Sequence, residues 1–285
     1  MKVLKKEDAG YPESLENILN PPKTLYILGD EANLNKKGIA IIGSRVCTEE
    51  GKQIAKEFAF KLSKMGLCII SGMAKGIDTA AHIGALEAGE RTIAVLGAGF
   101  NNIFPEENKE LLKQIIKGNG TVITEYPKDT KICSQGFIQR NRIVSGLSEA
   151  VLVIEAKHRS GTAVTADFAR KQGKTIFCIP HSLNQKEGIG TNRLLQKGAI
   201  LVTRPEDIQK YLKLEKIKSF LKENITINIP EEYLDIYNQI GESPTNIEEV
   251  CKKLKKDIDE INYGLTMLEI QGYICSMPGK NFKRL

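Results

Sequence analysis

The 285-residue sequence has no apolar run near the roughly 18 to 20 residues that a membrane-spanning helix needs. Its first residues, MKVLKKEDAGYPES, lack the apolar core of a signal peptide. These absences argue against a membrane or secreted protein, and we expect a globular protein of the cytoplasm. With 41% hydrophobic and 27% charged residues, the chain has enough apolar material for one large domain and a small one.

Residue patterns for metal, redox and catalytic chemistry are also missing. The six cysteines form no Cys-x-x-Cys pair, and several lie inside apolar runs, so we expect structural thiols and no metal site. No histidine stands in a recognisable catalytic spacing with serine and aspartate. The sequence therefore predicts no catalytic residues. Its histidines are His82, His158 and His181.

The two common nucleotide-binding fingerprints are absent as well. No G-x-x-x-x-G-K-[ST] occurs, and IIGSRVCTEEGKQ has one glycine where G-x-G-x-x-G would need three. The nearest match, LGAGFNN, has Phe100 and Asn101 where a glycine for close helix packing would follow. We therefore expect no cofactor.

Short β-branched runs alternate with segments of helical periodicity. The runs are continuously apolar, which is typical of strands covered on both faces, and the intervening segments end at glycine. Strand, helix, strand repeated in this way predicts an extended Rossmann-like, doubly wound and mostly parallel sheet. The predicted strands are Ile39 to Gly43, Leu67 to Ser71, Thr92 to Gly97, Thr121 to Glu125, Ala150 to Ala156, Lys174 to Pro180 and Ala199 to Thr203.

The alternation of strand and helix patterns ends after Thr203, and a lysine-rich stretch follows up to Pro230. Beyond it, the order helix, turn at GESPT, helix, helix and β-hairpin is typical of a winged helix-turn-helix. We predict a small C-terminal winged-helix domain at 230–285. Before it we place an N-terminal lead-in packed on the core at 1–35, the Rossmann-like domain at 36–210 and a linker at 211–229.

The net charge of +6 favours an anionic partner only weakly, but its distribution is uneven. From Ile225 to Leu285 there are 7 Lys and Arg against 10 Asp and Glu, while the rest of the chain has 34 against 25. A polyanion is therefore expected to prefer the first 224 residues.

Three predicted strand ends are small and polar: GSR (Gly43 to Arg45), SGMAKGID (Ser71 to Asp78) and SGT (Ser160 to Thr162). In an open parallel sheet the ligand crevice lies at the carboxyl ends of the strands. Glycine lets the backbone approach a ligand, and a following helix N-terminus favours an anion such as phosphate. Each loop taken alone is more typical of a tight strand-to-helix turn, because isolated glycine loops are weak signals. The Arg45 guanidinium, with no carboxylate until Glu49, favours a phosphate ligand at the first loop.

The stretch QGFIQRNRIVSGLSEAVLVIEA adds a ring and two cations beside a buried strand. Phe137 offers a face on which an unpaired base can stack, while Arg140 and Arg142 can follow a phosphate backbone. That combination suits single-stranded nucleic acid, because the bases of a duplex are already stacked. The alternative is ordinary packing, with Phe137 in the core and the arginines paired with Glu125 or Glu155.

Taken in order, these motifs resemble the DNA-processing protein A (DprA/Smf) family. The matching stretches are YPESLENILNPPKTLYILGD, IAIIGSR, SGMAKGIDTAAHIGAL, TIAVLGAGFNNIFPEEN, GFIQRNRIVSGLS, VIEAKHRSGTAVTADFARKQGKTIFCIP and GTNRLLQKGA. The resemblance implies a non-enzymatic protein of natural transformation and competence, with a Rossmann-like core that binds single-stranded DNA. It also implies a homodimer that protects incoming strands and helps load the RecA recombinase onto them.

The resemblance also implies which residues contact DNA. Asp78 and His82 belong to one of the same motifs, but there we expect an N-cap and a packed helix residue. Two positions depart from the family pattern: Ile138 stands where proline is usual, and His181 where glycine is usual. The implied DNA-binding residues are Gly43, Ser44, Arg45, Ser71, Gly72, Lys75, Phe137, Arg140, Asn141, Arg142, Ser160, Gly161 and Thr162.

A nucleotide-binding enzyme is the alternative. Phosphoribohydrolases of the lysine-decarboxylase-like type share the scaffold and use a P-G-G-x-G-T loop with a glutamate. Here RSGT matches that loop only in part, because the doubled glycine is missing, and Glu155 is the one carboxylate well placed to act as the catalytic glutamate. A likeness of scaffold does not establish the chemistry, so we retain this reading only as the alternative.

Overall fold

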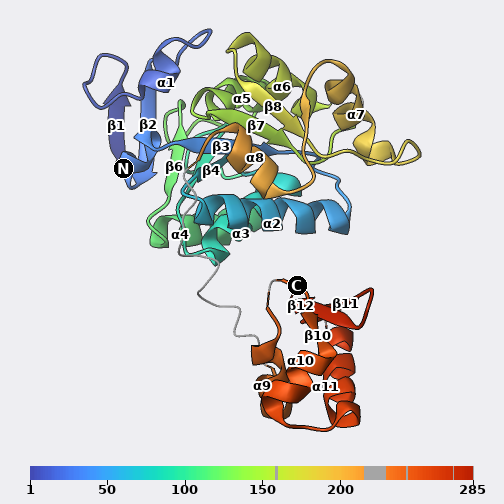
Figure 1. Cartoon of the computed structure of the whole chain (residues 1–285). Coiled ribbons are helices and arrows are strands. Elements are labelled where there is room, and N and C mark those ends of the chain that lie inside the picture. Colours follow the sequence, from blue (N-terminus) through green and yellow to red (C-terminus); the bar gives the residue numbers. More distant parts are fainter. Residues whose placement is uncertain (158–159, 215–228, 242, 272, 285) are drawn as a thin grey trace. The chain divides into compact units, whose positions relative to one another are not determined.

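A computed structural model describes residues 1–157, 160–214, 229–241, 243–271 and 273–284. The chain divides into two compact units, Met1–Lys216 and Ile217–Leu285 (Figure 1). Most of the predicted linker, 215–228, lies outside the described residues. Each unit is therefore considered by itself.

The first unit is built on a sheet in the order β1-β2-β6-β5-β4-β3-β7-β8-β9. Each strand from β6 to β9 in this order pairs in parallel with its neighbour, and the chain order reverses between β3 and β7. All seven predicted strands are present, so the doubly wound, mostly parallel fold is confirmed. Their bounds are β3 (Gly38–Ile42), β4 (Cys68–Ser71), β5 (Thr92–Leu96), β6 (Thr121–Thr124), β7 (Ala150–Val153), β8 (Thr175–Cys178) and β9 (Ile200–Leu201).

The N-terminal residues add two strands that the sequence did not predict. β1 (Lys2–Lys5) pairs antiparallel with β2 (Thr24–Gly29), and β2 pairs antiparallel with β6. The short 3-10 helix η1 (Glu31–Asn35) then leads into β3. This segment extends the sheet instead of only lying on it.

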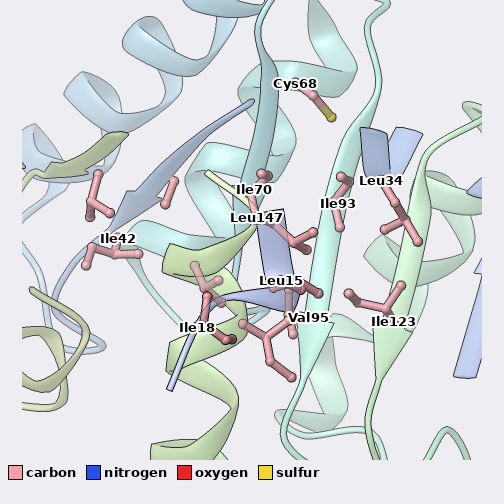
Figure 2. Close-up of a cluster of buried hydrophobic side chains, with 14 of the residues drawn as sticks. Leu15, Ile18, Leu34, Ile42, Cys68, Ile70, Ile93, Val95, Ile123 and Leu147 are labelled. Atoms are coloured by element: carbon pink, nitrogen blue, oxygen red, sulfur yellow. The ribbon is translucent and has the colours of Figure 1, made fainter. Parts of the chain in front are cut away.

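Helices cover both faces of this sheet (Figure 1). On β3, Ile39 and Ile41 pack toward α2 and α3, whereas Ala40 and Ile42 belong to the cluster on the opposite face, part of which Figure 2 shows. Such burial of successive residues on both faces explains the continuous apolar runs. One face carries α2 (Glu49–Lys64), α3 (Ile77–Glu87), α4 (Lys109–Lys117) and α8 (Pro205–Tyr211); the other carries α1 (Glu13–Glu16), α5 (Ser134–Gly146), α6 (Gly161–Lys171) and α7 (Ile189–Gln196). Two further 3-10 turns are η2 (Glu106–Asn108) and η3 (Lys186–Gly188).

The second unit has the predicted winged-helix order of elements. Its helices bury their own core, which includes Ile236, Val250, Leu265 and Leu268, against the wing residue Phe282. The small sheet has the order β10-β12-β11. The elements are α9 (Glu231–Gln239), β10 (Thr245–Asn246), α10 (Ile247–Leu254), α11 (Ile258–Ile270), β11 (Ile274–Met277) and β12 (Asn281–Arg284).

The described residues include no helix that is long and apolar enough to cross a membrane. Across the same ranges, no group of His, Cys, Asp and Glu is arranged to hold a metal ion. All six cysteines are free thiols. Cys68 and Cys178 are buried, and burial raises the pKa of each thiol to about 12, which fits the predicted structural role. Cys133 is exposed and does not belong to the core.

Candidate nucleic-acid interface

An open cleft of about 540 Å³ lies at the carboxyl ends of the parallel strands. The ends of β3 and β4 contribute to its lining, together with α5 and the N-terminus of α6. It sits where the strand order reverses between β3 and β7, the usual ligand position in a doubly wound sheet. Of the thirteen residues predicted to contact DNA, all except Ser71, Lys75 and Arg142 line this cleft.

The GSR loop after β3 presents one free cation to the cleft. A side chain at Gly43 would collide with Ile77 of α3, so glycine allows the loop to pack closely on that helix. The Ser44 N–H donates to the carbonyl of Glu155 at 2.9 Å, and its hydroxyl donates to the carbonyl of Val46. Arg45 is exposed, and within the described residues it has no carboxylate partner. Its guanidinium carbon lies 5.3 Å from the centre of the Phe137 ring.

The segment that carries Phe137 is a helix, which the sequence analysis did not predict. In α5, residues three and four apart share a face. Ser134, Phe137, Asn141 and Val144 follow this spacing, and all line the cleft. Arg142 lies on another face of the same helix. Helical periodicity therefore separates residues that are adjacent in the family motif.

A second aromatic ring stands beside Phe137 in the cleft wall. Phe104 is 45% exposed, and its ring centre lies 5.6 Å from that of Phe137 with a tilt of 46°. Phe104 is not among the predicted DNA contacts, although it lies in the family motif TIAVLGAGFNNIFPEEN. The available signal was its place in the loop that follows β5, at the same edge of the sheet as the other loops.

The N-terminus of α6 lines the cleft. Ser160 is the N-cap residue in extended conformation, but its side chain makes no capping hydrogen bond. Its hydroxyl oxygen is buried and has no partner among the described residues, of which the neighbouring 158–159 are not part. Among the described residues, nothing lies within 4 Å of a side chain added at Gly161, so that part of the structure leaves the start of the helix open. Such a terminus favours a negatively charged group.

Lys157 is a further cleft residue that the sequence analysis did not select. Its ammonium lies 3.5 Å from the Glu187 carboxylate, and its side chain is 44% exposed. A loose, exposed pair of this kind contributes little to stability. Lys157 thus adds positive charge beside the α6 N-terminus.

Arg140 lines the back of the cleft but is only 3% exposed. It donates to the carbonyl of Val95 at 2.9 Å and packs against Gly72, where a side chain would overlap its guanidinium. Burial lowers the pKa of Arg140 to about 10, while the negative charge of Asp78 raises it and the positive charge of Arg45 lowers it. The group stays protonated near neutral pH and forms the floor of the cleft.

Asp78 is not the N-cap that the sequence predicted. The N-cap of α3 is Gly76, which has a positive φ of 78°, and Asp78 is the second residue of the helix, in its first turn. Its carboxylate accepts from the backbone N–H groups of Gly72 and Ala74 at 3.1 and 3.4 Å, so it holds the loop after β4. Burial raises the pKa of Asp78, and the charge of Arg140 opposes that rise.

His82 is fully buried in α3, as predicted, with its Nδ1 2.8 Å from the Thr92 hydroxyl. Burial and the nearby Arg140 charge lower its pKa to about 3, so the ring is neutral. His181, which stands where the family usually has glycine, has a backbone φ outside the left-handed region, and its ring contacts the carbonyl of Ile154. Ile138, which stands where the family usually has proline, lies within α5, and its side chain is 42% exposed. Helical backbone thus supports the ring of Phe137 without proline.

The prediction that Arg142 follows a phosphate backbone is not supported by its position. Its side chain is 6% exposed and makes two hydrogen bonds of 2.7 Å to the two carboxylate oxygens of Glu125. It also donates to the carbonyls of Asn20 and Gln139. Arg142 therefore follows the alternative prediction, in which an arginine pairs with Glu125.

Two other predicted residues do not line the cleft. The Ser71 hydroxyl is buried and donates to the carbonyl of Ile41 at 2.7 Å. Lys75 forms an exposed ion pair with Glu107 at 2.7 Å. Both side chains have local partners, so neither belongs to the cleft as it stands.

Glu155, on which the enzyme alternative depended, is fully buried. Its carboxylate accepts from the backbone N–H and the hydroxyl of Thr48, the N-cap of α2. It is not among the residues that line the cleft. This carboxylate organises the start of a helix and has no open position for a nucleotide.

The fold and cleft together define a doubly wound α/β protein with a cationic, ring-bearing cleft and an attached winged-helix unit. The family model for DNA recombination-mediator protein A matches residues 2–213, and that for the DprA winged helix domain matches residues 228–280. The chain belongs to the DNA-processing protein A (DprA/Smf) family.

Individual relatives agree with this assignment. The chain is 33% identical over 279 residues to Protein Smf of Escherichia coli, covering 94% of this chain and 74% of the relative. It is 39% identical over 199 residues to DNA processing protein DprA of Bacillus subtilis, covering 70% and 67%.

Two solved structures have the same fold. DNA processing protein A of Streptococcus pneumoniae superposes with a TM-score of 0.70 at 37% identity, covering 75% of this chain and 74% of the other. The Helicobacter pylori protein superposes with a TM-score of 0.67 at 33% identity, covering 75% and 96%. The latter structure gives insights into the single-stranded DNA binding mode of that protein.

Proposed function

We propose that this protein binds single-stranded DNA in the cleft between β3 and β7. The observation that carries the proposal is the stack of the Arg45 guanidinium over the Phe137 ring, in a cleft that also contains the open α6 N-terminus. A cation supplies sequence-independent attraction to phosphate, and a ring supplies a surface for an unpaired base. The solved structure of the H. pylori relative, which concerns single-stranded DNA binding by that protein, supports single-stranded DNA as the ligand.

Each part of the cleft has a separate role in this proposal. Phosphates lie against Arg45 and the N–H groups at Gly161 and Thr162, and Asn141 lies beside them with its amide 3.5 Å from the Gly161 carbonyl. A base stacks at Phe137, which requires the Arg45 guanidinium to move aside or to become the next layer of the stack. Arg140 and Asp78 hold the floor without needing to touch DNA.

Salt dependence separates the two roles. For oligo-dT, we expect Phe137→Ala to weaken binding about tenfold with an unchanged slope of log affinity against log salt, because stacking releases no counterions. Arg45→Ala is expected to weaken binding and to make the slope shallower by about 0.7, the value for one phosphate contact on a single strand. Fluorescence anisotropy across a salt series measures both quantities.

The control for this experiment is Phe60→Ala. Phe60 lies in α2, is 38% exposed and does not line the cleft, so its loss should leave affinity unchanged. If Arg45→Ala and Phe137→Ala both bind oligo-dT as tightly as the unchanged protein, the cleft is not the DNA site.

We further propose that the protein acts as a homodimer that protects incoming strands and helps load RecA onto them. The recombination-mediator family to which the chain belongs supports this role. Sedimentation equilibrium should give twice the chain mass. In a strand-exchange reaction with single-stranded-DNA-binding protein present, adding the protein should shorten the lag of RecA, and Phe137→Ala should not. A monomer, or a lag that does not change, would contradict this part of the proposal.

A further inference from the structure

Phe104 is a partly exposed aromatic residue in the wall of the cleft. It belongs to the loop between β5 and η2 and is 45% exposed, although it is a large apolar side chain. It lines the same cleft as Phe137 and Arg45. A partly exposed ring in the wall of a cationic cleft is positioned to stack an unpaired base.

The geometry of the two rings gives Phe104 a role distinct from that of Phe137. Their centres are 5.6 Å apart and their planes are tilted by 46°. Consecutive bases in a regular stack are parallel, so one continuous stack cannot lie flat on both rings. A strand that uses both must separate two of its bases, and each base then packs on its own ring.

The surroundings of Phe137 fix where its ring lies. A side chain at Gly97 would come within 2.8 Å of the Phe137 ring, so the absence of one lets α5 approach the end of β5. Arg45 lies over the same ring at 5.3 Å. Phe104 therefore offers a second aromatic surface beside the Phe137 ring in the same cleft.

We propose that Phe104 is a second base-stacking residue, which takes a base adjacent to the one on Phe137 and opens the strand between them. The inference rests on the proposed function, because it needs a single strand in the cleft. It adds the prediction that the bound strand is bent between these two bases instead of remaining a continuous stack.

The experiment compares Phe104→Ala, Phe104→Leu and Phe104→Tyr for binding to oligo-dT. We expect alanine to weaken binding about tenfold, leucine to weaken it nearly as much, and tyrosine to retain it, because only tyrosine keeps a flat ring. The salt slope should not change, and Phe60→Ala again serves as the matched control. If the leucine variant binds as tightly as the unchanged protein, Phe104 contributes apolar packing only and the proposal is wrong.

A double variant tests whether Phe104 acts directly or through Phe137. If each ring holds its own base, Phe104→Ala should weaken binding by a similar factor with Phe137 present or already replaced by alanine. If Phe104 has no further effect in the Phe137→Ala background, it only positions Phe137, and the proposal is overturned. An oligomer of abasic sites should bind all these variants equally, since it offers no base to stack.

The outcomes distinguish this inference from the proposed function. A loss of binding for Arg45→Ala and Phe137→Ala with none for Phe104→Ala overturns the second stacking site and keeps the cleft as the DNA site. No loss for any of the three overturns both. Thermal unfolding of each variant verifies that the protein remains folded during the measurement.

Discussion

Replacing Arg142 with alanine is expected to lower the free energy of unfolding by about 3 to 5 kcal/mol, the range for breaking one side of a buried ion pair. The change leaves the Glu125 carboxylate, whose side chain is 17% exposed, without its two hydrogen bonds of 2.7 Å. It also removes the donors to the carbonyls of Asn20 and Gln139. Urea denaturation followed by circular dichroism measures the loss.

The informative contrast is with an exposed arginine. Arg170 pairs with Asp167 on the surface of α6 and its side chain is 68% exposed, so Arg170→Ala should cost less than about 1 kcal/mol. Protein that remains folded after Arg142→Ala should bind oligo-dT with an unchanged salt slope. The prediction is wrong if the variant is as stable as the parent and its slope of log affinity against log salt becomes shallower by about 0.7, the value for one phosphate contact. Arg142 would then bind DNA, and its ion pair with Glu125 would contribute little to stability.

The sheet could be predicted from the sequence because its strands are buried on both faces. Continuous runs such as Ile39 to Gly43 occur where each residue faces helices on one side or the other. The antiparallel strands β1 and β2 were missed because they lack such a continuous apolar run. β2 alternates buried and partly buried residues, and β1 buries one residue of four, so neither has the continuous pattern. Their position depends on pairing with β6, which is distant in the chain.

The cleft could be predicted in outline because the carboxyl ends of parallel strands meet at one edge of a sheet. That rule placed the loops at Gly43, Gly72 and Gly161 together. It could not assign side chains within a motif. Arg140 and Arg142 look equivalent in RNR, yet one forms the floor and the other pairs with Glu125, because α5 turns them to different directions.

Phe104 and Lys157 show a different limit of the sequence pattern. Their types are common in any surface loop, and only the folded positions of the loops after β5 and β7 bring them beside Phe137 and Ser160. The assignment of Asp78 failed for a related reason. An aspartate near a helix start predicts an N-cap, but the chain reaches α3 through Gly76 with positive φ, which moves Asp78 into the first turn.

Gly72→Ala is expected to destabilise the protein by displacing the buried side chain of Arg140. A Cβ at this position would overlap Nη1 and Cζ of Arg140, so the whole guanidinium must move. Arg140 is 3% exposed and donates to Val95, so displacing it loses a charged hydrogen bond and overpacks the site. Together these effects are expected to lower the free energy of unfolding by about 3 kcal/mol, measured in urea.

Gly161→Ala is the matched control, because Gly161 lines the same cleft and a Cβ there meets no atom of the described part of the chain within 4 Å. Its free energy of unfolding should stay within about 0.5 kcal/mol of the parent. The double variant Gly72→Ala with Arg140→Met should be more stable than the sum of the single changes predicts, since the shorter side chain leaves room for the new methyl group. Equal stability of Gly72→Ala and Gly161→Ala would mean that Arg140 does not pack on Gly72. A strictly additive double variant would mean that the loss at position 72 has another source, and the floor of the cleft would then need a different explanation.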